Sequence, residues 1–242
     1  MKLVMPTLPA PFLDKWLPIV PDLEFYYESG YFFKGKPINH RISEVIVSKP
    51  EREWFQKVRN GEFGEDKQVD LLCKIERGEK AHAYLDHYHR GRSYNATPYQ
   101  KLCANLLTLD LWDEWEVVGS EYLLVDVRRS IAGTCDMILR HKVEKDRFAI
   151  ADLKTKSPAY KADGSPKIPS KKDYSAQLGG YINLLNLTWP QLKVEDCFII
   201  YANDLMAEIH KDRSRRNKYN YIDCVTTYEG CRGAFFAEME DI

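Results

Sequence analysis

The chain contains an apolar run at Gly133-Thr-Cys-Asp136-Met-Ile-Leu, followed closely by a second one at Phe148-Ala-Ile-Ala-Asp152-Leu-Lys154-Thr. Both runs have the length and composition of buried strands, and each carries one carboxylate. Side chains alternate faces along a strand, so Asp152 and Lys154 project to the same side while Leu153 points away. The pattern predicts two adjacent strands, each with one acidic group, and a lysine close to the second.

These three polar residues indicate a chemistry. Two carboxylates on neighbouring strands repel each other, and a bound divalent cation relieves the repulsion. Mg²⁺ suits such a site because it needs only one or two protein carboxylates and fills its shell with waters and substrate phosphates. A lysine beside the metal positions or activates the attacking water, and burial lowers a lysine pKa readily. Asp136, Asp152 and Lys154 therefore predict phosphodiester hydrolysis, and the alternative is a hairpin with solvated charged ends.

Length and composition fit a single domain. The 242 residues, 44% of them hydrophobic, suffice for a full core. Within one domain spanning 1–242, we expect an N-terminal arm and helix over 1–65, a catalytic core over 66–205 and a C-terminal helical region over 206–242. The net charge of −1 neither supports nor excludes a nucleic-acid partner, because only the binding groove must be basic.

The cysteine pattern bears on cofactors and compartment. Six cysteines are scattered without a Cys-X-X-Cys pair: Cys73, Cys103, Cys135, Cys197, Cys224 and Cys231. This spacing argues against a zinc ribbon and a disulfide framework, and it predicts reduced thiols inside the cell. Pro6 and Pro9 come too early for a secretory apolar core, and no segment reads as a membrane span. We expect a cytoplasmic protein without membrane contact.

The order of elements predicts an α/β fold with a central mixed β-sheet flanked by helices. Strands are expected at about 116–126, 131–140, 147–154 and 196–202, where Val, Ile and Tyr are frequent. Helices are expected at about 50–58, 66–89, 98–112 and 172–187, with further helix after Ser214. Proline and aromatic residues in the first 35 positions predict an ordered arm that lies on the domain.

Two of these helices carry further signals. The helix over 66–89 ends at Gly91, and its apolar positions fall near one face together with a histidine: Leu71, Leu72, Ile75, His82 and Leu85. His82 is therefore expected to face inward, four residues after Gly78, where a backbone can approach closely. The helix over 98–112 opens at Thr97-Pro98, which offers an N-cap and a proline at the first helical position.

At this point the chain resembles a known family. The motifs that carry the likeness are Gly78-Glu-Lys-Ala-His82, Glu121, Gly133-Thr-Cys-Asp136, Asp152-Leu-Lys154-Thr155 and Tyr174-Ser-Ala-Gln177-Leu-Gly-Gly-Tyr181. Their order over roughly residues 25–205 is similar to that of the PD-(D/E)XK nucleases, in particular the RecB-like exonuclease branch with the mitochondrial genome maintenance exonuclease and phage relatives. The resemblance implies a restriction-endonuclease-like core. One departure is Cys135, which stands where the family motif has proline before the first aspartate.

The resemblance also implies a set of metal ligands. These are His82, Asp136, Asp152 and the carbonyl of Leu153, with Glu121 as a candidate support for a second ion. The cofactor would be one or two Mg²⁺ ions, and the histidine ligand would make Mn²⁺ an effective substitute. No iron–sulfur cluster is expected, because the members of the family that carry one have a tight C-terminal trio of cysteines, and Cys73, Cys224 and Cys231 lack that spacing. The alternatives left open are a hydrogen-bonded core histidine for His82 and an ordinary edge-strand charge for Glu121.

A nucleic-acid contact is expected from the helix that follows the second carboxylate. Gln177 and Tyr181 are four residues apart on one helix face, with Tyr174 a turn earlier, so an amide and a phenol can reach the scissile phosphate or its flanking nucleotide. We therefore expect Gln177 and Tyr181 to take part in catalysis, and Tyr174 and Lys156 to contact the nucleic acid. The alternative is a tyrosine packed under the sheet and a glutamine facing water. Further lysines over 156–172 and the basic stretch 211–216 are candidate backbone contacts.

The functional hypothesis from sequence is a Mg²⁺- or Mn²⁺-dependent DNA exonuclease that prefers single-stranded ends. An arch or cap formed by the N-terminal aromatics Trp16, Phe25 and Tyr26 with the histidine helix would admit single strands and exclude duplex. The rivals are a duplex-resecting exonuclease of the phage lambda type and a catalytically inactive nucleic-acid-binding protein on the same scaffold. No obligate protein partner is evident in the sequence.

Overall fold

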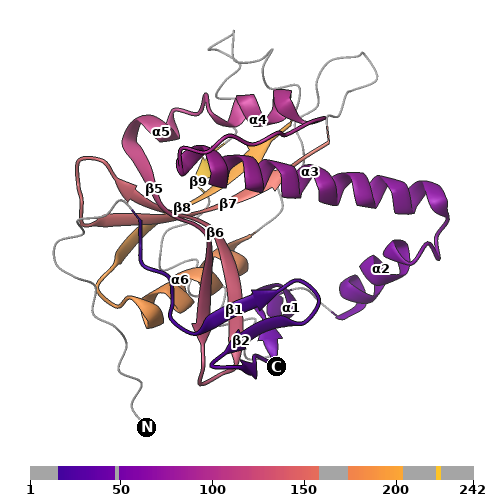
Figure 1. Cartoon of the computed structure of the whole chain (residues 1–242), viewed down its shortest axis with the longest axis horizontal. Coiled ribbons are helices and arrows are strands. Elements are labelled where there is room, and N and C mark those ends of the chain that lie inside the picture. The colour runs from indigo at the N-terminus through magenta and orange to yellow at the C-terminus, as the bar shows by residue number, and fades with distance from the viewer. Residues whose placement is uncertain (1–15, 47–48, 158–173, 204–221, 225–242) are drawn as a thin grey trace.

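The computed structural model describes residues 16–46, 49–157, 174–203 and 222–224 (Figure 1). In chain order the elements are β1 (Leu23–Tyr26), β2 (Gly30–Phe33), β3 (Lys36–Pro37), β4 (His40–Arg41), α1 (Ile42–Ile46), α2 (Lys49–Arg59), α3 (Glu65–His89), α4 (Gln100–Leu106), α5 (Leu111–Glu114), β5 (Trp115–Asp126), β6 (Ile131–His141), β7 (Arg147–Thr155), α6 (Ser175–Thr188), β8 (Lys193–Ala202) and β9 (Ile222–Cys224). They build the expected α/β architecture, a mixed sheet flanked by helices.

The main sheet has six strands. β5, β6 and β7 form an antiparallel meander, and β8 lies parallel to β7 after α6 has carried the chain across. Two parallel strands require a crossover of this kind because both begin at the same end of the sheet, so the chain has to return to that end between them. β9 pairs antiparallel with β8. The expectation of helix after Ser214 is therefore wrong for residues 222–224, which cover the edge of β8 instead; the rest of that region lies outside the described residues.

Each face of the sheet has its own hydrophobic core. In Figure 1, α3, α4 and α5 lie over one face, and α6 and α1, with β1 and β2, lie over the other. Along β7, Ala149 and Ala151 belong to the core under α3, whereas Phe148 and Ile150 belong to the core with α6. This alternation is the two-residue period of a strand. The same period places Asp152 on the α6 side of the sheet.

The β6 strand changes partner along one of its edges. β5 pairs with one edge of β6 from Ile131 to His141. On the opposite edge, β7 pairs with 137–140 and β4 pairs with 131–132. Among the described strands, residues 133–136 have no partner on that edge. This interruption separates the ends of β4 and β7 and lies directly beside Asp136.

The helix expected over 98–112 is wrong as a single element. The chain forms the short helices α4 and α5, and the N-cap of α4 is Tyr99, which makes no capping hydrogen bond through its side chain. Thr97, the expected N-cap, instead donates its backbone N–H and its hydroxyl to the Asn95 side chain, at 3.0 and 2.7 Å. The Thr97 hydroxyl is therefore engaged in a local turn with Asn95 and does not cap the helix.

The expected inward face of α3 is correct only for its second half. Ala81 and Leu85 are buried, but Leu72 is 46% exposed and Ile75 is 36% exposed. The reason is that the N-terminal half of α3 projects beyond the sheet, toward α2 (Figure 1). Gly91 ends the helix as expected, in a left-handed conformation with φ 69°.

The described part of the N-terminal arm is ordered and packed. Leu17 donates its backbone N–H to the Val118 carbonyl at 2.6 Å, and the Tyr122 hydroxyl donates to the Pro18 carbonyl. β1 and β2 pair antiparallel in a second sheet of three strands with β3. Residues 1–15 lie outside the described part of the chain. No helix in the described ranges is long and apolar enough to cross a membrane.

Gly133 provides a test of the packing beside the interruption. A Cβ at this position would lie 2.9 Å from Ile42 Cγ1 and 2.9 Å from Tyr181 Cε1. Gly133→Ala is therefore expected to lower the free energy of unfolding by about 1–3 kcal/mol through overpacking, as measured by urea denaturation.

The matched control is Gly78→Ala in α3. The nearest atom to a Cβ there is Thr155 Oγ1 at 3.8 Å, an ordinary contact, so the approach at Gly78 does not require glycine. Alanine should stabilise this helix interior by up to about 1 kcal/mol. Equal effects of the two substitutions would contradict the close packing at Gly133.

Candidate metal centre and active site

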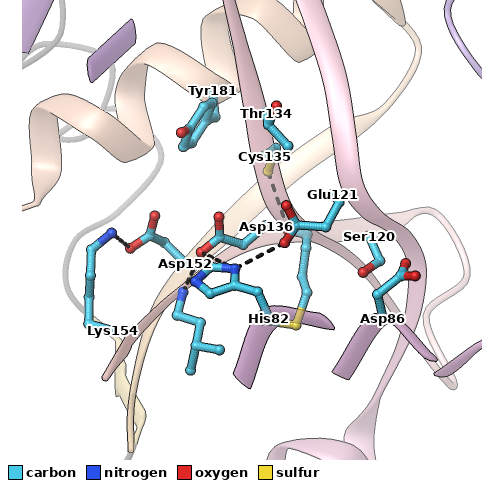
Figure 2. A network of polar contacts seen from close by, with 12 residues as sticks. His82, Asp86, Ser120, Glu121, Thr134, Cys135, Asp136, Asp152, Lys154 and Tyr181 are labelled. Atoms are coloured by element: carbon cyan, nitrogen blue, oxygen red, sulfur yellow. Dashed lines mark hydrogen bonds and ion pairs between the residues drawn. The ribbon is translucent and has the colours of Figure 1, made fainter. Parts of the chain in front are cut away.

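Three side chains that commonly bind metals meet where α3 crosses β5 and β6. His82 Nδ1 lies 3.0 Å from Glu121 Oε1 and 3.7 Å from Asp136 Oδ2. One ligand atom from each of the three residues lies within 4.8 Å of the others. Figure 2 shows the imidazole between the two carboxylates. His82 thus lies beside Glu121 and Asp136, two of the residues that the resemblance brings to the metal site; its role as a metal ligand stays a prediction.

The backbone brings Glu121 and Asp136 opposite each other. In the β5–β6 ladder Ser120 pairs with Met137 and Tyr122 pairs with Cys135, so the positions between them face each other across the two strands. Glu121 has φ 47°, a left-handed conformation that is rare for a residue other than glycine. Backbone strain of this kind is concentrated at functional sites. The unusual backbone at Glu121 favours its expected role at the metal site over that of an ordinary strand charge, and the role stays a prediction.

Asp136 replaces a missing ladder bond between β6 and β7. The ladder ends at the pair Met137 and Ala151, and beyond it the Leu153 backbone N–H donates to Asp136 Oδ2 at 2.7 Å. In an extended strand the N–H and C=O of one residue point to the same side. The Leu153 carbonyl is therefore also directed toward β6, which is the direction that its expected role as a metal ligand requires.

Asp152 is held from two sides. Its side chain is fully buried; Gln177 Nε2 donates to Oδ1 at 2.8 Å, and Lys154 Nζ lies 2.5 Å from Oδ2. The Gln177 amide also donates to the Tyr181 hydroxyl at 3.3 Å. Gln177 thus faces the acidic cluster and not water. Tyr181 combines both interpretations made from sequence, because its ring packs against Gly133 while its hydroxyl contacts Gln177.

The protonation state of His82 follows from its neighbours. Burial alone lowers the pKa of His82, but the charge of Asp136 and the hydrogen bond with Glu121 outweigh burial and raise the pKa to about 9. The imidazole is therefore protonated at neutral pH. It supplies the positive charge among carboxylates that would otherwise repel one another.

The pKa values of Asp136, Asp152 and Lys154 are shifted by their burial and by one another, and the shift of Lys154 corrects an expectation from the sequence. Burial raises the pKa of Asp152 to about 6, although Lys154 opposes the shift, and burial also raises the pKa of Asp136. Burial lowers the pKa of Lys154, but the charges of Asp152 and Asp136 outweigh it, so the net pKa is raised. The expectation of a lowered lysine pKa is wrong because a carboxylate lies within ion-pair distance of the ammonium.

The residues expected to contact nucleic acid lie next to this cluster. Lys154 Nζ is 4.8 Å from the centre of the Tyr174 ring, and Lys156 Nζ is 5.5 Å from the centre of the Tyr201 ring. The backbone N–H of Lys156 donates to the Ala202 carbonyl at 2.9 Å, which extends the β7–β8 pairing. The other lysines of the loop after Lys156, and the basic stretch 211–216, lie outside the described residues.

The residues present fit a divalent cation. The cluster offers one imidazole and two carboxylates within 4.8 Å of one another, with Asp152 close enough for its charge to raise the pKa of His82. Asp152 Oδ2 is buried and accepts no hydrogen bond of normal geometry, although the Lys154 ammonium is near it. Carboxylate oxygens with one imidazole suit Mn²⁺ well and Mg²⁺ acceptably.

Two residues at the site were not singled out from the sequence. Asp86 and Arg90 follow His82 by four and eight residues on α3, and Arg90 connects Asp86 with the carbonyl of Ser120, next to Glu121. Their spacing from His82 was the available signal, because residues four apart share a helix face. Arg-to-carboxylate pairs at this spacing are so frequent on helix surfaces that the signal is weak.

Comparison with known proteins does not place the chain in a family. No protein-family model matches it, and no curated protein matches it either. The functional interpretation therefore depends on the geometry of the site.

Metal binding is expected to displace a proton. A histidine ligand must be neutral, whereas His82, with a pKa of about 9, is protonated at neutral pH. Mn²⁺ should therefore release about one proton per ion near neutral pH, and its affinity should rise about tenfold per pH unit until the pKa of His82 is reached. Calorimetric titration in two buffers of different ionisation enthalpy measures both quantities.

The control for this experiment is His82→Gln. This variant should bind Mn²⁺ more weakly and with little dependence on pH over the same interval, because the titrating group has been removed. Binding of Mn²⁺ to the unchanged protein without proton release would show that His82 is not a ligand.

Proposed function

We propose that the protein is a metal-dependent DNA exonuclease of the PD-(D/E)XK class, of the RecB-like type, acting on single-stranded ends. The observation that carries the proposal is the convergence of His82, Glu121 and Asp136 beside the Asp152–Lys154 pair, where β6 and β7 part. The order and spacing of these residues along the chain add support. A restriction-endonuclease-like core is part of the same proposal.

The metal site would be formed by His82, Glu121 and Asp136, with Asp152 and the Leu153 carbonyl beside them. Mg²⁺ or Mn²⁺ bound there polarises a phosphate and lowers the pKa of a bound water. Asp136 keeps its place through the Leu153 N–H, and Asp152 keeps its place through the Gln177 amide. Both carboxylates are thus fixed before a ligand arrives, which avoids a reorganisation cost during the reaction.

Lys154 acts as a charged donor in this proposal. Its raised pKa keeps it an ammonium at neutral pH, so its N–H groups orient a water or a phosphate oxygen and do not abstract a proton. The pKa of Tyr181 is raised far above its usual value by burial and by Asp136, so its hydroxyl keeps its proton. Both groups are therefore hydrogen-bond donors at neutral pH.

The preference for single strands is supported by exposed aromatic side chains on the projecting part of the molecule. Trp54, Phe55 and Phe63 are 48%, 43% and 42% exposed. The Trp54 ring contacts the rings of both phenylalanines, and Lys67 lies over the Phe63 ring. Unpaired bases stack on such rings with about 1–3 kcal/mol per base. The Trp16 ring lies over the Arg90 guanidinium at 4.4 Å, a contact between the N-terminal arm and the end of the histidine helix; the arch of Trp16, Phe25 and Tyr26 stays a prediction.

Replacing the lysine separates binding from chemistry. Lys154→Met is expected to reduce cleavage of single-stranded DNA by about 10²–10³-fold, because removal of one preorganised donor costs this much. Binding of Mn²⁺ should be retained, since Lys154 is not a ligand. Cleavage of a labelled oligonucleotide and calorimetric Mn²⁺ titration measure the two effects.

The matched control is Lys145→Met, which removes an exposed lysine paired with Glu116 far along the sheet and should cleave as the unchanged protein does. If the unchanged protein cleaves no DNA or RNA with either metal, the alternative of an inactive nucleic-acid-binding scaffold replaces the nuclease proposal.

The form of the substrate tests the exonuclease assignment. Linear single-stranded DNA should be degraded fastest, linear duplex much more slowly, and circular single strands not at all, because the proposed reaction starts at an end. Gel analysis of the three substrates gives the comparison. Efficient cleavage of circles would rule out an exonuclease, and preferred degradation of duplex would favour the lambda-type alternative.

A further inference from the structure

The left-handed backbone conformation at Glu121 has to be stabilised by the residues around it. A residue with a Cβ in this conformation costs about 1–2 kcal/mol, and such strain persists only where the surroundings determine it. Glu121 lies in the interior of β5, with ladder pairs on both sides of it. A regular strand conformation is therefore the local alternative that the neighbouring structure has to prevent.

Arg90 contacts the peptide that carries this strain. Its Nη2 donates to the Ser120 carbonyl at 3.3 Å, and this carbonyl belongs to the peptide unit that ends at the Glu121 nitrogen. A positive φ at Glu121 sets the orientation of that unit relative to the glutamate side chain. The guanidinium thus binds the group whose rotation would release Glu121 into an ordinary strand.

Arg90 is itself placed rigidly. Its Nε donates to Asp86 Oδ1 at 2.6 Å, while Asp86 Oδ2 accepts from Arg92 at 3.0 Å. The Trp16 ring from the N-terminal arm lies over the guanidinium at 4.4 Å. Gly91 and the residue after it close α3 with the paired hydrogen bonds of a Schellman motif, to Tyr88 and His87.

Helix α3 and its C-cap residue Arg90 therefore contact the same short segment of β5 at two points. His82 reaches the Glu121 side chain, and two turns later Arg90 reaches the carbonyl just before Glu121. Figure 2 shows Asp86 and Ser120 side by side, next to Glu121 and on the other side of it from Asp152. One contact fixes the carboxylate and the other fixes the backbone from which it projects.

We propose that Arg90 is a positioning residue for the metal ligand Glu121: by binding the Ser120 carbonyl, it holds the strained backbone that aims the Glu121 carboxylate at His82 and Asp136. This inference rests on the proposed metal site. It assigns a function to the Asp86–Arg90–Trp16 contacts, none of which touches the cluster directly.

Mn²⁺ affinity of Arg90→Met, measured by calorimetry, tests the proposal. The variant is expected to bind Mn²⁺ about 10–100-fold more weakly, the usual consequence of removing a group that orients a ligand. Arg92→Met is the matched control, because it removes the same charge from the same Asp86 carboxylate but makes no contact with the Ser120 carbonyl; its Mn²⁺ affinity should stay unchanged. Arg90→Lys, which keeps the charge but not the fork of donors, should bind Mn²⁺ with intermediate affinity and serves if Arg90→Met does not fold.

A double-mutant cycle separates positioning from general support of the fold. If Arg90 acts through Glu121, its substitution should have almost no further effect on Mn²⁺ affinity in a Glu121→Gln background. Additive losses, or an unchanged affinity of both Arg90 variants, would overturn the inference while leaving the metal site intact. Absence of Mn²⁺ binding by the unchanged protein would overturn the metal site, and the inference with it.

Discussion

A hydrogen bond between a side chain and the backbone, from the Leu153 N–H to Asp136 Oδ2, organises this end of the sheet. Up to Met137 and Ala151 the strands β6 and β7 are joined by main-chain pairing; beyond that point a carboxylate takes over. Because the Asp136 carboxylate accepts the Leu153 N–H in place of a main-chain carbonyl, the two strands separate here without leaving that N–H unsatisfied. It also leaves the edge of β6 open, so that groups from both layers of helices reach one place: His82 from α3, and Gln177 from α6.

The second constraint is charge. Acidic groups from three consecutive strands are gathered here; Asp152 is fully buried and the Asp136 side chain is 12% exposed, whereas the Glu121 side chain is 42% exposed. Burial of ionised carboxylates is unfavourable without compensation. Two cations supplied by the chain itself provide it: the imidazolium of His82 and the ammonium of Lys154. The two are not equivalent. The imidazolium lies within the group of potential ligands and can give up its proton to a metal, whereas the ammonium is held at the Asp152 carboxylate on the α6 side.

Much of this arrangement could be predicted from the sequence because it depends on local periodicity. The strands around Asp136 and Asp152 were located within a residue or two, since apolar β-branched runs define them, and the helix bearing His82 was bounded correctly by its composition and by Gly91. What was not predicted depends on distant neighbours. The exposure of Leu72 follows from how far α3 extends beyond the sheet.

The same distinction applies within the site. The raised pKa of Lys154 follows from the position of a carboxylate that no periodicity determines, and the left-handed backbone at Glu121 has no sequence signal, because glutamate is not a residue that usually adopts it. The later start of α4 reflects a competing local turn, in which Asn95 engages the expected N-cap Thr97. Sequence patterns therefore indicated which residues would meet, and tertiary contacts determined their charge states and backbone conformations.

The separation of the hydrophobic interior into two layers has a consequence for the assembly of the site. The sheet has one core on each face, and the acidic cluster receives a histidine from α3 on one face and a glutamine from α6 on the other. The cluster is therefore complete only when both helices keep their places on the sheet, so packing in either core affects the geometry of the same few polar side chains.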